Sequence, residues 1–314
     1  MTGRTFALEH IRRMRGGTQA QLLRCADGGY YVVKFQNNLQ GIRILANDLL
    51  GTLLAEQLGL PIAQPAVVDV GEKLIRYSDE MTIELKSAHV RCQSGLSFGS
   101  RYPADEDFPG GGVLAATYDL IPEPQMRSLE NLRDYAGMLV FDKWTCNTDG
   151  RQTILGRHGT AGPYHATMID QGFCFNGMLW NFPDSPLRGL YSSTSVYAGY
   201  RGFDAFEPWL GRLENEINEG VLQRACEEIP REWYEENVSA LARLIEKLDR
   251  RRKRVRDLLW TLLKTSPQTF PNWSEQLPDR RVLDGNVTQL PLGETGRPRL
   301  LRSDRRTRRD AAAG

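Results

Sequence analysis

The sequence is poor in histidine and cysteine, which limits the classes of site it can contain. Its 314 residues include 4 His and 5 Cys. The cysteines show no CxxC spacing, and their odd number leaves one unpaired (Cys25, Cys92, Cys146, Cys174 and Cys226). A disulfide scaffold is therefore disfavoured, and a reducing compartment is expected.

The chain also lacks a signal-type apolar N-terminus and any apolar stretch long enough to cross a bilayer. We therefore expect a cytoplasmic protein with no membrane contact. A net charge of +1 argues against a nucleic-acid binder that uses the whole chain. The 40% hydrophobic and 25% charged residues are typical of an ordinary globular protein with one large or two modest domains.

Two carboxylates on short polar turns stand out in residues 141–175. Asp149 lies in an Asn-Thr-Asp-Gly turn after an apolar segment, and Asp170 ends the predicted strand at residues 166–169. A hairpin between them would bring both carboxylates to one cleft. Phosphoryl transfer needs one carboxylate that orients the attacking hydroxyl and another that holds magnesium. The same residues also fit ordinary turns and caps.

The N-terminal segment predicts a meander of strands. Residues 14–25 indicate a strand, a glycine turn and a second strand, and the Gly28-Gly29 turn leads into a strand at residues 30–35. The backbone amides of the first turn could cover phosphates. A glycine turn by itself is also consistent with a simple hairpin.

Lys34 stands in the middle of this last strand. It either points to solvent or holds the phosphates of a nucleotide. The second role needs an acidic partner, and residues 42–58 have the apolar spacing of a helix that ends at Gly59. Asp48 lies beside the apolar stripe of that helix and is preferred as the partner over Glu56.

The remaining segments complete an α+β pattern. Strands are predicted at residues 66–70, 82–85 and 94–102, and a last apolar run follows at 113–120. Helices are predicted at 128–140, 205–217, 220–225 and 233–263. The basic run 250–254 on the last helix indicates a solvated face. The connector that would bind adenine is left open between residues 98–101 and 115–118.

The order of these elements, from the glycine turn and the strand lysine to the two carboxylate turns, resembles that of a protein-kinase-like fold. Within this fold the chain resembles the HipA-like kinases. Residues 17–23 are similar to that family's Gly-x-Gln phosphate loop, Asn147-Thr148-Asp149 to its catalytic turn, and Asn47-Asp48 to its helical Asn-Glu. The resemblance implies ATP and Mg²⁺ as cofactors and a Ser or Thr hydroxyl of a protein as acceptor. It implies a β-rich N-lobe with one main helix, followed by a mostly helical C-lobe.

The resemblance also assigns roles to single residues. Asp149 would be the catalytic aspartate, Lys34 would bind the phosphates with Asp48 orienting it, and Asp170 would hold the metal. The phosphate loop would comprise Gly16, Gly17, Thr18 and Gln19.

Two positions depart from the family pattern. Arg151 stands where a histidine is usual, and Ile154 stands where a metal-binding asparagine is usual. Gln152 is the nearest amide that could replace that asparagine as a metal ligand. These departures leave room for a pseudokinase that binds nucleotide and acts as a regulatory module.

The expected domains are an N-lobe at residues 1–122, a C-lobe at 123–265 and a basic, disordered tail at 266–314. The alternatives are a small-molecule kinase on the same fold and a nucleic-acid binder acting through the basic residues 297–309. Expected partners are a protein substrate and an antitoxin-type protein, with at most weak nucleic-acid binding by the tail.

Overall fold

The computed structural model describes residues 2–105, 113–114, 116–157 and 162–276. Internal contacts divide the chain into Met1–Glu275 and Gln276–Gly314. No helix within the described ranges is long and apolar enough to span a membrane. The lobe boundary expected near residue 122 stays a prediction.

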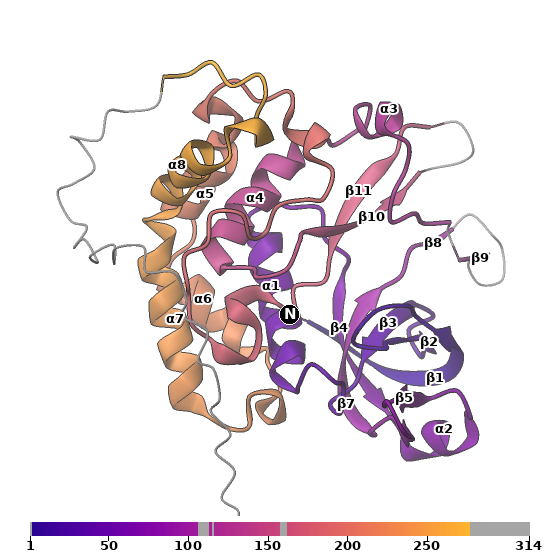
Figure 1. The fold of residues 1–314 in the computed structure, drawn as a ribbon. Helices are drawn as coiled ribbons and strands as arrows, with labels where there is room; N and C mark the ends of the chain where they lie inside the picture. Colours follow the sequence, from indigo (N-terminus) through magenta and orange to yellow (C-terminus); the bar gives the residue numbers. More distant parts are fainter. Residues whose placement is uncertain (1, 106–112, 115, 158–161, 277–314) are drawn as a thin grey trace, which may run out of the picture. The chain divides into compact units, whose positions relative to one another are not determined.

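Five strands of the first unit form a closed barrel in the order β1-β2-β3-β7-β4 (Figure 1). The strands are β1 Gly3–Arg13, β2 Gln21–Cys25, β3 Tyr30–Lys34, β4 Pro65–Val70 and β7 Gly95–Arg101. All neighbours are antiparallel except β1 and β4, whose parallel pairing closes the barrel. Alternate side chains such as Leu23, Val33 and Val68 fill the interior.

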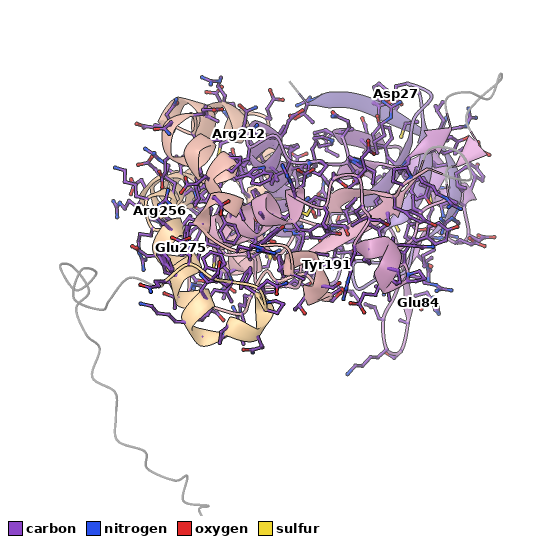
Figure 2. All side chains as sticks on the ribbon, turned by 90° about the horizontal axis from the view of Figure 1, so that it is seen from above. Asp27, Glu84, Tyr191, Arg212, Arg256 and Glu275 are labelled. Atoms are coloured by element: carbon purple, nitrogen blue, oxygen red, sulfur yellow. The ribbon has the colours of Figure 1, made fainter. Side chains whose placement is uncertain are left out.

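The main helix of this part, α1, spans Arg43–Gln57. Its residues are buried on most sides, including Asn47 and Asp48, so it lies in the core rather than on a surface. It ends before Gly59, whose φ of +68° is the left-handed conformation common after helices. The Arg212 side chain, labelled in Figure 2, donates to the Leu58 carbonyl at 2.7 Å and ties this end to a later helix.

Three two-stranded antiparallel sheets accompany the barrel in the part of the chain that the structure describes. They comprise β5 Thr82–Glu84 with β6 His89–Arg91, β8 Ala104–Asp105 with β9 Val113–Leu114, and β10 Gln152–Gly156 with β11 His165–Ile169. In the last one Gln152 pairs with Ile169, so the residues just before β10 and just after β11 meet at one end. The hairpin expected between the two carboxylate turns is therefore present.

The rest of the first unit is mainly helical. Its helices are α2 Glu72–Tyr77, α3 Glu123–Met126, α4 Asp134–Thr145, α5 Glu207–Asn215, α6 Glu219–Glu227, α7 Val238–Arg252 and α8 Val255–Thr265. Short 3₁₀ segments lie at Cys174–Leu179, Thr194–Tyr197, Phe203–Ala205, Arg231–Tyr234 and Pro267–Thr269. The larger hydrophobic core joins α1 to α4 and the later helices. The chain thus has the expected α+β composition.

Several predicted boundaries differ from the structure. The first strand begins at Gly3, well before the predicted residue 14. Ser128 does not cap α4, because its hydroxyl donates to carbonyls of the preceding turn at Pro124 and Gln125. The long helix predicted at 233–263 is two helices that meet at residues 253–254.

The basic run 250–254 was expected to be a solvated face, and this prediction is wrong for Arg251. Arg251 is only 6% exposed, and its guanidinium donates to the Lys143 carbonyl and to Asp184. Folding also continues beyond residue 266, because Phe270 is buried and packs on Tyr197. The remainder of the predicted tail lies outside the described residues.

Of the two connector candidates, residues 98–101 lie inside β7. The other, 115–118, falls partly outside the described residues, and Tyr118 forms an isolated bridge with Leu155 of β10. The chain that leaves the barrel after β7 begins at Tyr102.

Candidate functional site

Lys34, Asp48 and Asp170 meet at the end of the barrel next to α1. The Lys34 Nζ donates to Asp48 Oδ2 at 2.8 Å and to Asp170 Oδ1 at 2.9 Å. The side chains of Lys34 and Asp48 are 9% and 2% exposed, whereas that of Asp170 is 26% exposed. Residues from β3, α1 and the turn after β11 therefore converge, and Asp170 is the member open to a ligand.

The charges of this group are stabilised mutually. Burial by itself would lower the pKa of Lys34, but the two carboxylates raise it well above its usual range. Burial raises the pKa of Asp48 to about 6, although Lys34 opposes that shift. Burial would also raise the pKa of Asp170, but the attraction and hydrogen bond of Lys34 lower it below its usual value. At neutral pH the group holds one cation between two carboxylates.

The turn that presents Asp170 is fixed to α1. Asp170 itself has a φ of +57°, which is uncommon for a residue other than glycine. The Gln171 amide donates to Asp48 Oδ1 at 2.9 Å, and Asn47 Nδ2 donates to the Gly172 carbonyl at 2.8 Å. A Cβ at Gly172 would lie 2.7 Å from Ile44 Cγ2, so the turn approaches the helix too closely for a side chain. Asp48 thus orients both Lys34 and this turn.

Asp149 lies on the second turn, directly after α4. Helix α4 ends at Thr145, and the next residue, Cys146, has a φ of +54°, a left-handed conformation that turns the chain out of the helix. The Asn147 side chain accepts from the Asp149 amide at 3.1 Å, while Asn147 itself is buried. The Asp149 side chain is exposed and receives hydrogen bonds from Gly150 and, at 3.4 Å, from Gln152. Its carboxylate therefore projects from a rigid turn toward solvent.

Arg151 links the two turns, a role that its place in the sequence did not reveal. Its guanidinium forms a buried ion pair with Asp142 on α4. It also donates to the Ile169 carbonyl at 2.9 Å and to Gln171 Oε1 at 2.7 Å. The carboxylate of Asp142 is also hydrogen-bonded by Asn147. One arginine thus connects the helix before Asp149 to the residues on either side of Asp170.

The predicted phosphate loop is a tight turn between β1 and β2. Gly16 has a φ of +125°, and the Gln19 amide donates to its carbonyl at 3.1 Å. Gly17 is exposed and Thr18 is half-buried. The Gln19 side chain exchanges two hydrogen bonds with the backbone of Glu84, at 2.7 and 2.9 Å. The loop is therefore held to the β5–β6 hairpin.

No hydrogen bond in the described part of the chain joins this loop to Lys34, Asp149 or Asp170. The structure therefore joins Lys34, Asp48 and Asp170 directly, and places Asp149 beside Gln152. The roles assigned to these residues and to the loop stay predictions.

Residues 8–160 match a family model described as HipA-like kinase. The resemblance to the HipA-like kinases is confirmed. The matched range contains Lys34, Asp48 and Asp149, and Asp170 follows ten residues after its end. None of the curated proteins matches the chain.

The solved structures to which the chain is similar include kinases of low sequence identity. Fam20 of hydra with a sugar has 12% identity and a TM-score of 0.44, covering 86% of this chain and 89% of that chain. The Helicobacter pylori proinflammatory kinase CtkA has 12% identity and a TM-score of 0.47, covering 82% and 99%. The Golgi casein kinase with Mn/ADP bound has 11% identity and a TM-score of 0.43, covering 84% and 74%.

Residues 151 and 154, which depart from the HipA-like pattern, have different surroundings in the structure. Arg151 is buried, and its guanidinium binds Asp142, the Ile169 carbonyl and Gln171. Ile154 is half-buried on β10, where its apolar side chain offers no ligand atom. Gln152 is exposed at the start of β10 and pairs with the residue before Asp170. It is thus an amide whose strand partner directly precedes Asp170.

Asp170 fits a metal bound together with phosphates. Both hydrogen bonds that its carboxylate makes within the described residues reach Oδ1, which leaves Oδ2 for a ligand. The described residues contain no cluster of three or more His, Cys, Asp or Glu suited to a metal. Magnesium commonly takes one or two carboxylates and completes its shell with substrate phosphates and water, so one carboxylate and one amide are compatible with it.

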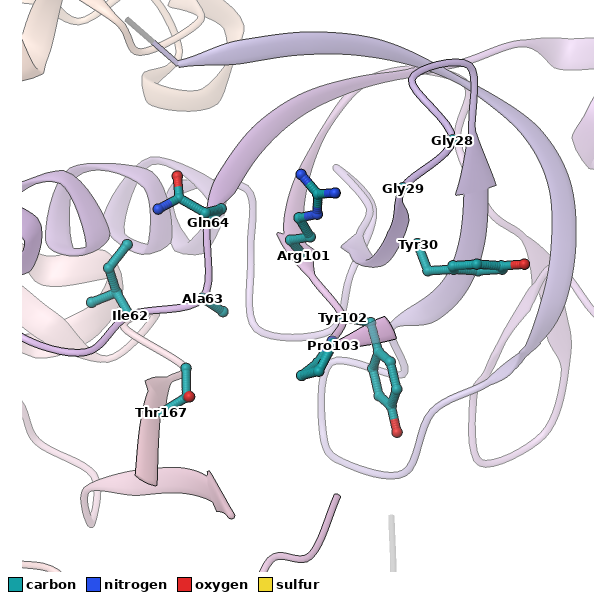
Figure 3. A pocket seen from close by; sticks show the side chains of 10 residues that line it. All are labelled: Gly28, Gly29, Tyr30, Ile62, Ala63, Gln64, Arg101, Tyr102, Pro103 and Thr167. Atoms are coloured by element: carbon teal, nitrogen blue, oxygen red, sulfur yellow. The ribbon is translucent and has the colours of Figure 1, made fainter. Parts of the chain in front are cut away.

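A pocket of about 310 Å³ lies elsewhere (Figure 3). It is lined by the β2–β3 turn at Gly28 and Gly29, the segment from Ile62 to Gln64, and the end of β7 with Arg101 and Tyr102. None of the predicted site residues lines it.

Proposed function

We propose that this HipA-like chain is an ATP- and Mg²⁺-dependent kinase that transfers the γ-phosphoryl group to a Ser or Thr hydroxyl of a protein. The main support is the position of Lys34 between Asp48 and Asp170. A buried lysine with a carboxylate on each side is costly to desolvate, and such an arrangement is common where a lysine must meet phosphates.

In this proposal each residue has one task. Lys34 binds the α- and β-phosphates, and Asp48 keeps its ammonium in place when a nucleotide draws it from Asp170. The backbone amides of Gly16, Gly17, Thr18 and Gln19 cover the phosphates. Two lobes, the barrel and the helices, would enclose the nucleotide.

The acceptor side relies on the other turn. Asp149 is exposed on a rigid loop and would accept a hydrogen bond from the acceptor hydroxyl, which orients its oxygen for attack. Asp170 Oδ2 and the Gln152 amide oxygen would hold Mg²⁺. When bound, the ion neutralises negative charge on the phosphates. Arg151 keeps the two turns in register.

Labelled ATP tests this proposal directly. Purified protein is incubated with Mg²⁺ and γ-labelled ATP, as the wild type and as Asp149→Ala, Asp170→Asn and the exposed control Asp204→Asn. We expect label on the wild type or on lysate proteins, and a loss of about 10²-fold or more in the first two variants. Calorimetry should show that Asp149→Ala binds Mg-ATP within about twofold of the wild type. Full transfer by Asp149→Ala would refute its catalytic role.

A nucleotide-binding pseudokinase is the second candidate, and Ile154 favours it. An apolar side chain at the position of the usual asparagine removes one metal ligand. Binding of Mg-ATP without label on the protein itself or on any lysate protein would support this alternative.

The proposal also covers the cellular location of the protein and its partners. All five cysteines are free thiols, which is consistent with the cytoplasmic location that we propose. A protein substrate and an antitoxin-type partner stay predictions. Weak nucleic-acid binding by the basic residues 297–309 also stays a prediction, and these residues lie outside the described ones.

A further inference from the structure

The loop at residues 183–190 is held firmly against the predicted catalytic turn. The Gly189 amide donates to the Asp149 carbonyl at 3.2 Å, and the Arg151 amide donates to the Leu190 carbonyl at 3.1 Å. Arg151 and Tyr191 form a parallel bridge directly afterwards. The loop therefore runs alongside the residue that would orient the acceptor hydroxyl.

Three cations, of which Lys143 and Arg251 are buried, bind the same loop. Lys143 is 4% exposed, and its Nζ donates to the carbonyls of Pro186 at 2.7 Å and Arg188 at 2.6 Å. Arg251 and Arg254 both bind the Asp184 carboxylate, at 2.5 and 2.9 Å. A buried ammonium that lost these carbonyl partners would be strongly destabilising. Movement of the loop away from Lys143 is therefore disfavoured.

The other side of the loop is open. Leu187 is 54% exposed and so offers an apolar surface to solvent. Arg188 is also exposed, and its guanidinium has no hydrogen bond or ion pair within the described residues. Arg188 directly precedes Gly189, whose amide binds the Asp149 carbonyl. The segment that carries this cation and this apolar side chain is thus joined through its backbone to the residue that would orient the acceptor hydroxyl.

We propose that residues 186–188 form the acceptor-binding wall of the site and that Arg188 selects an acidic residue near the Ser or Thr of the acceptor protein. This inference rests on the proposed kinase function and specifies its substrate. Leu187 contacts an apolar residue of the same acceptor segment. The anchors Lys143 and Arg251 act as positioning residues that keep this wall at a fixed distance from Asp149.

A peptide library with fixed central Ser or Thr and varied flanking residues tests the proposal. The wild type, Arg188→Glu, Arg188→Lys and the control Arg224→Glu are compared with Mg²⁺ and labelled ATP. Arg224 is another exposed arginine, on α6, so its reversal changes the net charge equally. We expect Arg188→Glu to shift the preference from acidic to basic flanking residues by about tenfold in kcat/KM. Arg188→Lys should keep the acidic preference.

The outcomes separate this inference from the function on which it rests. Mg-ATP affinity and the slow transfer to water should stay within about twofold of the wild type in Arg188→Glu. Equal preferences in wild type and Arg188→Glu, or the same shift in Arg224→Glu, would overturn the role of Arg188. Transfer to water but to no peptide would refute a protein acceptor at this wall. A wild type that binds no Mg-ATP would refute the kinase function itself.

Discussion

Replacing Arg151 with methionine should destabilise the fold strongly, because it leaves Asp142 charged and buried. The two side chains are 1% and 0% exposed. The Asp142 carboxylate accepts two hydrogen bonds from Arg151, and only the one from Asn147, at 3.0 Å, would remain. Breaking a buried pair from one side costs about 3–5 kcal/mol.

The carbonyl of Ile169 and the amide oxygen of Gln171 would lose a donor as well. We therefore expect the upper part of that range for Arg151→Met, which corresponds to a fall of about 10³-fold in the folding equilibrium constant. Urea unfolding followed by fluorescence measures this change.

Two comparisons make the test sharp. Arg250→Met removes an exposed pair with Glu246, with side chains 79% and 63% exposed, and should change stability by less than about 0.5 kcal/mol. The double variant Arg151→Met/Asp142→Leu removes both charges, so it should be more stable than Arg151→Met alone. A cost below about 1 kcal/mol for Arg151→Met would refute the reasoning that this pair connects the two turns.

Three further predictions concern the elements around the site. Burial lowers the pKa of Lys143 from 10.5 to about 8, so the folded protein loses this proton before the unfolded chain does. Between pH 8 and 10.5 the free energy of unfolding of the wild type should therefore rise relative to that of Lys143→Met. Urea unfolding at several pH values measures both free energies, and a difference between them that does not change with pH would contradict the prediction. Gly189→Ala should cost about 1–3 kcal/mol and lower phosphate transfer, because its φ is +77° and a Cβ would lie 2.5 Å from the Asp142 Cβ. Gly150→Ala, whose nearest contact is 3.6 Å, is the matched control, and an equal effect in both would argue against strain. Gln19→Leu should raise KM for ATP about fivefold with kcat nearly unchanged, because it removes the hydrogen bonds that hold the phosphate loop to Glu84. Steady-state kinetics measures both constants, and an unchanged KM would exclude a role of this loop in ATP binding.

Local pattern was sufficient to predict several elements of this protein. The apolar spacing of residues 42–58 gave α1 to within a residue at each end, because helix periodicity and a terminal glycine are both local signals. The strand predicted at residues 30–35 and the hairpin from Gln152 to Ile169 follow from alternation and turn residues in the same way, although the strand ends at Lys34 and not beyond it. The helix break at residues 253–254 was missed, because α7 and α8 each continue the apolar spacing across it.

The sequence by itself determined an α+β chain with a strand lysine, an acidic helix residue and two carboxylate turns, since each depends on neighbouring residues. Only the tertiary structure decided that Lys34 touches both Asp48 and Asp170, which are 14 and 136 residues away. It also decided that Arg151 is a buried connector and that Arg251 is not solvated, although both lie in segments that read as exposed turns or charged faces. Burial and pairing of a charge depend on which distant elements pack around it, and no spacing along the chain records that.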